Sequence, residues 1–82
     1  SNRESGNGFS DIMIQIDDSD TGIIIEVKYD EKNDLETECQ KAIQQINETG
    51  YTNVLHQQDV HRILKYGIAC KRKDCRVLLE LE

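Results

Sequence analysis

The sequence contains no proline and no tryptophan, and no apolar run approaches the roughly 20 residues needed to cross a bilayer. Its polar N-terminal residues also lack the basic and then apolar pattern of a signal peptide. Hydrophobic residues make up 37% of the 82 residues, which is enough for one small core and leaves little beyond it. We therefore expect a single soluble, cytoplasmic domain, marginally stable because a chain this short buries only about 60% of its unfolded surface.

Positive charge is also scarce. Lys and Arg number 10 against 16 Asp and Glu, so the net charge is −6. Proteins that hold nucleic acid by counterion release need clustered cations, so such binding depends here on a local patch. The one dense basic cluster has two equally good explanations. It can contact the nucleic-acid backbone, or it can be a charged turn that keeps a hairpin soluble. That cluster consists of Lys71, Arg72, Lys73 and Arg76.

Cysteines and histidines do not occur at the spacing of a zinc site. The cysteines, Cys39, Cys70 and Cys75, are odd in number, and we expect reduced thiols. Cys70 and Cys75 flank a four-residue turn and come close enough for a disulfide under oxidising conditions. His56 and His61 lie in a polar segment without a carboxylate-rich partner pattern, which is typical of surface histidines.

Alternating and β-branched residues predict two strands in the first part of the chain. Residues 11–16 have isoleucine at every second position, and residues 23–29 form a β-branched run suited to a buried central strand. Residues 17–22 have the composition of a polar turn, so the two strands should form a hairpin. This turn is similar to part of a calcium loop, but Tyr29 stands where that loop requires a bidentate glutamate.

The remaining residues predict a main helix and a second hairpin. Asn33 and Glu36 are three apart, as in a capping box, and precede apolar residues at helical spacing. The helix should occupy residues 33–49 and stop at Gly50. A shorter helix and two strands should follow, over residues 52–58, 63–70 and 76–81. The predicted fold class is α+β: a mixed β-sheet with a first hairpin, a main helix and a second, C-terminal hairpin.

Charged residues in the predicted central strand need an explanation. Suppose that the first hairpin closes with Ile16 opposite Ile23. Asp11 then lies opposite Lys28, and Glu26 is the neighbour of Lys28 on the same face. Charges inside an otherwise apolar strand are costly to bury unless they are paired or hold a metal. A solvated strand face, with an ion pair between Asp11 and Lys28, explains the pattern equally well.

The chemistry of these side chains suits a divalent metal. Asp11 and Glu26 can hold Mg²⁺ or Mn²⁺ through oxygen ligands, with a backbone carbonyl near Val27 and waters completing an octahedron. Lys28 can activate a metal-bound water and steady the charge that develops on a phosphate. The three charged residues are therefore candidates for metal-assisted hydrolysis of a phosphodiester.

The same residues are similar to a known motif. Residues 8–11 (Gly-Phe-Ser-Asp), followed by residues 26–28 (Glu-Val-Lys), resemble the PD-(D/E)XK motif of metal-dependent nucleases. Further segments resemble one bacterial branch of that superfamily, a domain often found at the C-terminus of AAA-ATPase-like proteins. These segments are residues 1–8, 23–29, 42–46, 65–69 and 75–77. The resemblance covers nearly the whole chain.

This resemblance implies a role for individual residues. Asp11 and Glu26 would be metal ligands and Lys28 the catalytic lysine. Gln45 on the following helix would be a further active-site residue, and Tyr51 is a weaker correspondence. The implied cofactor is Mg²⁺ or Mn²⁺. The implied partner is nucleic acid, with DNA favoured over RNA.

The chain also departs from the family. The family's core has a helix and a first strand before the strand that carries the aspartate, whereas here the helix is absent and the strand is at most residues 1–4. The implied fold is a restriction-endonuclease-like core that is N-terminally truncated, a fragment of a longer protein with an ATPase-like domain upstream. Phe9 stands where this branch carries arginine, which removes a cation. A homodimer would cover the strand edges and apolar surface left exposed.

The leading hypothesis is a metal-dependent nuclease domain that hydrolyses phosphodiester bonds in nucleic acid. The alternative is a catalytically inactive accessory or interaction module of an AAA-ATPase-like protein. Loss of metal binding in a chain that keeps Asp11, Glu26 and Lys28 would favour the alternative.

Overall fold

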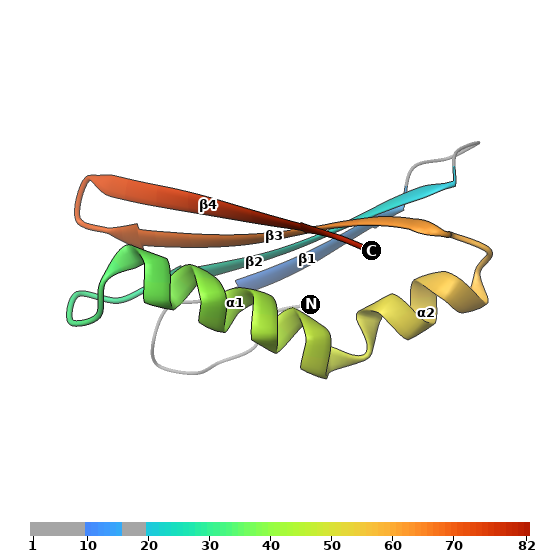
Figure 1. Cartoon of the computed structure of the whole chain (residues 1–82), viewed down its shortest axis with the longest axis horizontal. Coiled ribbons are helices and arrows are strands. Elements are labelled where there is room, and N and C mark those ends of the chain that lie inside the picture. The colour runs from blue at the N-terminus through green and yellow to red at the C-terminus, as the bar shows by residue number, and fades with distance from the viewer. Residues whose placement is uncertain (1–9, 16–19) are drawn as a thin grey trace.

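Two helices lie against one face of a four-stranded sheet (Figure 1). This computed structural model describes the backbone of residues 10–15 and 20–82 and the side chains of residues 20–82. In chain order the elements are β1 (Ser10–Gln15), β2 (Thr21–Tyr29), α1 (Leu35–Thr49), α2 (Tyr51–Gln57), β3 (Arg62–Lys71) and β4 (Asp74–Leu81). The α+β fold class predicted from the sequence is therefore confirmed. Neither described helix is long and apolar enough to span a membrane.

The strands lie in the order β1-β2-β3-β4, and the sheet is mixed. β1 pairs with β2, and β3 with β4, in antiparallel hairpins as predicted, whereas β2 and β3 are parallel. Parallel neighbours need a crossover connection, and α1 and α2 provide it. Both helices of the described chain are therefore on the same face of the sheet (Figure 1).

Helix α1 begins differently from the prediction. Its N-cap is Asp34, whose Oδ1 accepts a hydrogen bond from the Thr37 backbone N–H at 2.7 Å. Hydrogen bonding to Thr37 lowers the pKa of Asp34. Asn33 instead donates from Nδ2 to Oε2 of Glu38 at 2.7 Å. The capping box expected to begin at Asn33 does not form, because the next residue along has an oxygen that reaches the open N–H groups of the helix.

The other element boundaries lie within two residues of the predicted ones. Gly50 has a left-handed φ of 82° and ends α1 as predicted, and α2 follows it directly. In the second hairpin Lys71 pairs with Asp74. Only Arg72 and Lys73 form its turn, so β4 begins two residues before the predicted start at residue 76.

The second hairpin also contains a disulfide between Cys70 and Cys75. The two residues are direct partners in the β3–β4 register, and their Cα atoms are 4.2 Å apart. The expectation of reduced thiols is wrong for this pair, because directly opposite residues on antiparallel strands bring their side chains together. Cys39 is the free cysteine. Its Sγ donates to the Arg76 carbonyl at 3.2 Å, and burial raises the pKa of its thiol.

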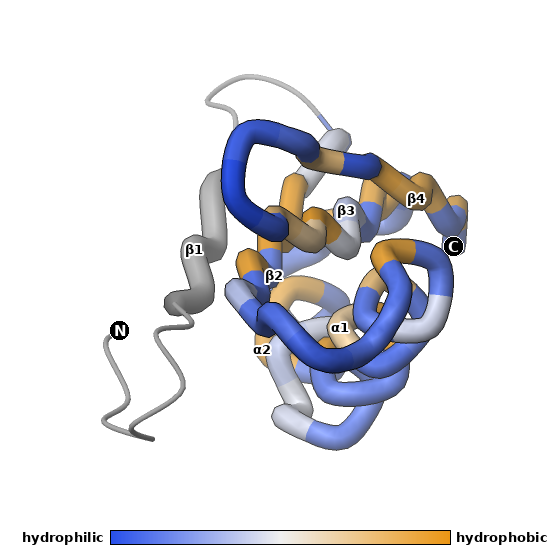
Figure 2. The backbone as a smooth tube through the Cα atoms, turned by 90° about the vertical axis from the view of Figure 1, so that its left-hand side faces the viewer, coloured by the Kyte–Doolittle hydropathy of each residue, from blue (hydrophilic) through white to orange (hydrophobic). Residues whose placement is uncertain are grey.

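The hydrophobic core lies between the helices and the sheet. Its side chains come from both helices, from β2 and β3, and from the connection that precedes β3. They are Ile24, Ile43, Ile46, Leu55, Val60 and Ile63. Tyr51 and Leu78 pack against this cluster. Figure 2 shows the helices beneath the sheet, with hydrophobic residues concentrated along β2, β3 and β4.

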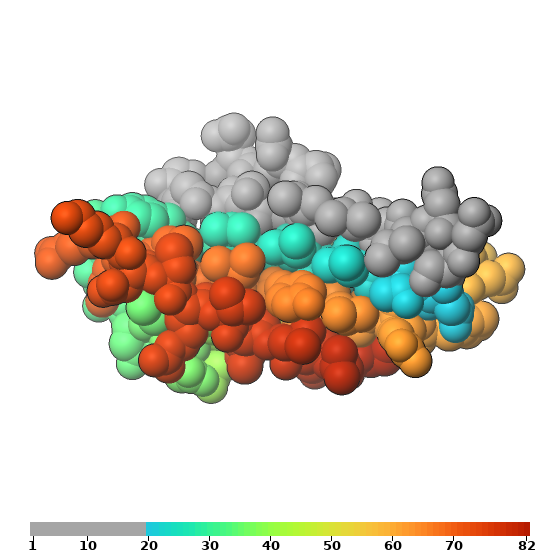
Figure 3. Space-filling model, turned by 90° about the horizontal axis from the view of Figure 1, so that it is seen from above, coloured from blue at the N-terminus to red at the C-terminus, as the bar shows by residue number. Residues whose placement is uncertain are grey.

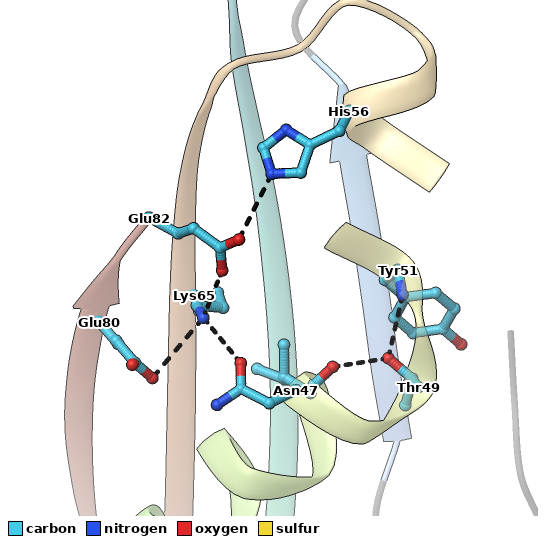
Figure 4. Close-up of polar contacts among 8 residues, drawn as sticks. Asn47, Thr49, Tyr51, His56, Lys65, Glu80 and Glu82 are labelled. Atoms are coloured by element: carbon cyan, nitrogen blue, oxygen red, sulfur yellow. Dashed lines mark hydrogen bonds and ion pairs between the residues drawn. The ribbon is translucent and has the colours of Figure 1, made fainter. Parts of the chain in front are cut away.

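A charged side chain is part of the same buried layer. Lys65 on β3 has an exposed fraction of 3%, and its Nζ donates to Oδ1 of Asn47 at 2.7 Å and to Oε1 of Glu82 at 2.9 Å (Figure 4). The bond from Lys65 is the main cause that lowers the pKa of Glu82. Burial of an ammonium group is tolerated when the group is paired and hydrogen-bonded. These contacts therefore join α1, β3 and the residue that follows β4.

The face of the sheet opposite the helices is apolar, and we call it the open sheet face. Its side chains are half-buried on β2 and β3 and exposed on β4. Among residues 20–82, the apolar residues of this face are Ile23, Ile25, Val27, Leu64, Tyr66, Ile68, Val77, Leu79 and Leu81. Figure 3 looks onto this face, and no helix of the described residues covers it.

Gly67 determines how closely α1 approaches the sheet. A Cβ atom at this position would lie 2.6 Å from the carbonyl oxygen of Cys39 and 2.9 Å from Cγ1 of Ile43. Both atoms belong to α1, and the first is a backbone atom, so the helix itself would have to move. The distance between α1 and β3 is therefore one that only glycine permits at residue 67.

We predict that Gly67→Ala lowers the free energy of unfolding by about 2 kcal/mol, because the added methyl group forces backbone movement in a packed core. The matched control is Gly22→Ala, whose Cβ would meet only side-chain ends, the nearest being Cδ1 of Leu55 at 2.9 Å. Leu55 can rotate, so the loss should be smaller. Urea denaturation followed by circular dichroism measures both losses, and equal values would contradict the role assigned to Gly67.

Candidate active site

The first hairpin pairs in a different register from the predicted one. Ile23 pairs with Ile14 and not with Ile16, and Asp11 pairs with Glu26 and not with Lys28. The prediction is wrong by two positions because it assigned residues 21 and 22 to the connection, whereas both belong to β2. Side chains alternate with a period of two, so a shift of two positions does not change which residues share a face.

Glu26 lies on the face of β2 that α1 covers. Its exposed fraction is 0%, and the residues before it on this face, Gly22 and Ile24, are also buried. Its direct neighbour on β3 is Gly67, where α1 leaves no room for a side chain. Lys28, the next residue on the face, is half-buried. The interpretation of these charges as a solvated strand face is therefore wrong for Glu26.

The structure brings Lys28 and Gln45 together. Nζ of Lys28 on β2 donates a hydrogen bond to Oε1 of Gln45 on α1 at 2.7 Å. The two residues are 17 positions apart in the sequence, and the packing of α1 on the sheet makes them neighbours. An amide oxygen thus holds the ammonium group beside the segment of β2 that contains Glu26.

The pair opens onto a cleft along helix α1, which we call the α1 cleft. The cleft has a volume of about 460 Å³ and is lined by Lys28, Lys41, Gln44, Gln45, Glu48 and Thr49. Sequence reasoning assigned no role to four of these residues. Polar residues on the solvent side of a helix carry no signal that separates a binding surface from ordinary hydration.

Glu26, Val27 and Tyr51, which the sequence also predicts as site residues, are not among the residues that line this cleft. Val27 is half-buried on the open sheet face, and its predicted role involves only its backbone carbonyl. Tyr51 is the first residue of α2 and packs against the hydrophobic core.

The basic residues of the second hairpin lie in two environments. Arg72 and Lys73 are exposed at its turn, and Lys71 is half-buried. Arg76 donates from Nη1 to Oε1 of Glu36, in the first turn of α1, at 2.8 Å. The cluster seen in the sequence is thus divided between an exposed tip and an ion pair that links β4 to α1.

The histidines have partners of their own. Nδ1 of His61 lies 2.8 Å from Oδ1 of Asp20, and hydrogen bonding to His61 lowers the pKa of this carboxyl group. Nδ1 of His56 lies 2.9 Å from the Val60 carbonyl oxygen. Both histidines therefore contribute to local contacts at the end of the sheet remote from Lys28.

The metal site predicted around Glu26 lies only partly within the residues whose side chains are described. Among residues 20–82, whose side chains are described, no group of three or more His, Cys, Asp or Glu residues is arranged to hold a metal. Asp11 lies outside this range, but its backbone pairs with that of Glu26. Carboxylates on directly opposite residues of antiparallel strands can share one ion, and their oxygens are preferred ligands of Mg²⁺ and Mn²⁺.

Comparisons with known proteins bear on the same residues. A family model described as the PD-(D/E)XK nuclease superfamily matches residues 1–80. Comparisons with curated proteins and with solved structures gave no significant match. The matched range includes β1, β2 and α1, the elements that carry Asp11, Glu26, Lys28 and Gln45. The chain belongs to the PD-(D/E)XK nuclease superfamily.

Proposed function

We propose that the chain is a metal-dependent nuclease domain that hydrolyses phosphodiester bonds in nucleic acid, with DNA as the substrate. Membership of a nuclease superfamily supports nucleic acid as the partner. The observation that carries the proposal is the hydrogen bond from Lys28 to Gln45 beside the buried Glu26. An ammonium group held next to a buried carboxylate can serve a reaction in which negative charge develops on a phosphate.

Asp11 and Glu26 would hold Mg²⁺ or Mn²⁺ through their carboxylate oxygens, with the Val27 carbonyl as a further ligand. When bound, such an ion polarises a phosphoryl oxygen and makes an attacking water more acidic. The burial of Glu26 suits this role, because a low-dielectric environment strengthens the attraction between a carboxylate and a divalent cation.

Lys28 and Gln45 would act on the substrate. The Lys28 ammonium orients the attacking water and stabilises charge on the phosphate in the transition state. Gln45 accepts a hydrogen bond from this ammonium group and so restricts a long, flexible side chain. Because the group is already in position, little reorganisation is needed at the moment of reaction.

Calorimetric titration of Mn²⁺ and Mg²⁺ into the chain tests the metal site. We expect binding by the parent chain and an affinity at least about tenfold weaker for the Asp11→Ala, Glu26→Ala double variant, because both carboxylate ligands are lost. Circular dichroism must show equal helix content in the two proteins. A parent chain that binds neither ion, or two proteins of equal affinity, would reject the site.

Lys28→Ala is the control that separates catalysis from metal binding. It should keep the parent's affinity for Mn²⁺ and lose about 100-fold in the rate of cleavage of labelled DNA, because a donor that stabilises transition-state charge contributes about that factor. A parent chain that binds the metal and cleaves neither DNA nor RNA would instead support a catalytically inactive accessory module.

We also propose that the exposed tip of the second hairpin contacts the phosphate backbone. Each neutralised phosphate contributes about 0.9 to the slope of log K against log salt concentration. Lys73→Ala should reduce the slope by about that amount, and Arg76→Ala should reduce it less because Arg76 is paired with Glu36. Fluorescence anisotropy of a DNA duplex in EDTA measures the slopes. Equal slopes for the two variants would exclude this arrangement.

We propose that two copies of the chain associate through the open sheet face. Three large apolar residues of β4 on this face are exposed, with exposed fractions of 56% for Val77, 46% for Leu79 and 69% for Leu81, and covering them would remove apolar surface from water. Apolar sheet faces pack on one another about 10 Å apart. The use of one surface by both copies gives a symmetric, closed contact.

Sedimentation velocity tests this association. The sedimentation coefficient of the parent chain should rise with concentration, and Leu79→Glu should abolish the rise because it places a charge in the contact. Leu79 has an exposed fraction of 46%, so this change should leave the monomer folded. A monomer at every concentration of the parent chain would reject the dimer and leave the face to a different partner.

A further inference from the structure

The α1 cleft carries opposite charges toward its two ends. Lys41 and Glu48 both line it and lie seven residues apart on α1, about 10 Å along the helix axis. Gln44 donates from Nε2 to Oε2 of Glu48 at 3.2 Å, which holds the Glu48 carboxylate at the cleft. Lys28 adds a second ammonium group from the sheet. An anion entering the cleft is therefore attracted toward Lys41 and repelled at Glu48.

The size of the cleft suits one small molecule. Its volume of about 460 Å³ falls in the range of small-molecule sites, roughly 300 to 1,000 Å³. The amide groups of Gln44 and Gln45 can both donate and accept hydrogen bonds, as recognition of a sugar or a base requires. The lining as a whole combines ammonium groups for a phosphate with neutral polar groups for the remainder of a nucleotide.

Lys41 can turn toward a phosphate at low cost. Its Nζ lies 3.3 Å from Oε2 of Glu38, in an ion pair between residues three apart on the helix, and 53% of its side chain is exposed. The Lys41 ammonium is mostly exposed and stays hydrated when it turns, whereas the Glu38 side chain has an exposed fraction of 7% and needs a partner. The same Glu38 oxygen accepts a hydrogen bond from Asn33, so this buried carboxylate keeps a partner when Lys41 moves away.

We infer that the α1 cleft binds the terminal nucleotide of a nucleic-acid strand, with its phosphate held by Lys28 and Lys41. The inference rests on the proposed function and names its substrate class as strand ends. A strand that continued along α1 would bring its next phosphate toward Glu48, where two negative charges repel. Glu48 therefore selects against internal positions of a strand.

Titration of thymidine 5′-monophosphate into the chain in EDTA tests the cleft without metal and without cleavage. The parent should bind it saturably, Lys41→Ala should bind it about tenfold more weakly, and Glu48→Gln should bind it more tightly. The matched control is Lys32→Ala, which removes the same charge from an exposed residue that does not line the cleft. Alanine and glutamine are good helix formers, so α1 should persist in the variants.

Saturable binding that weakens in Lys41→Ala and not in Lys32→Ala supports the inference. A parent that shows no saturable binding, or equal losses in both variants, overturns it. Cleavage assays distinguish an error in the proposed preference for strand ends from an error in the proposed nuclease activity. If the parent cuts circular single-stranded DNA as fast as a linear strand of equal length, the nuclease stands and the preference for ends is rejected.

Discussion

The close contact between α1 and β3 at Gly67 is the constraint on which the candidate site depends. Gly67, where α1 leaves no room for a side chain, is the direct neighbour of Glu26 in the sheet, and Glu26 has an exposed fraction of 0% on the same face. Ala42 lies over Gly67, and Gln45 follows it by one helical turn. That spacing brings the amide of Gln45 within reach of Lys28. A helix farther from the sheet would lose the burial and the hydrogen bond together.

Among the described side chains, charge is buried at two places on the sheet face that the helices cover. Glu26 on β2 and Lys65 on β3 both have exposed fractions of 3% or less. The desolvation of Lys65 is offset by hydrogen bonds to Asn47 and Glu82, so this end of the sheet is tied to α1 by polar contacts. Buried charges such as Glu26 and Lys65 also help to specify how the strands pair. A slip of one residue would move these charges and the core side chains to the opposite face of the sheet.

Periodicity is sufficient to predict the fold class and the main elements, because it reports which face of each element is buried. The motif resemblance selects Glu26 and Lys28 as candidate site residues without coordinates, and their catalytic roles stay predictions. Register is harder to predict. Gly22 has the composition of a turn residue but belongs to β2, where Leu55 from a distant helix packs against it. The partners of Lys65 are similarly 17 and 18 residues away in the sequence, beyond any local pattern. The strand register and the partners of Lys65 therefore depend on long-range packing, which local sequence patterns do not report.

The parallel pairing of β2 with β3 joins residues far apart in the chain, such as Thr21 and Arg62. Each hairpin and each helix is formed by local contacts, whereas closing the long loop between β2 and β3 loses chain entropy before its contacts form. Lys28 lies near the end of β2 and Gln45 lies in the middle of this loop, and α1 rests on β3 more than on β2. During synthesis, a growing chain that has not reached β3 contains the first hairpin and α1 but lacks the strand against which α1 packs most. The packing that fixes α1 on the sheet is therefore complete only after β3 has been added.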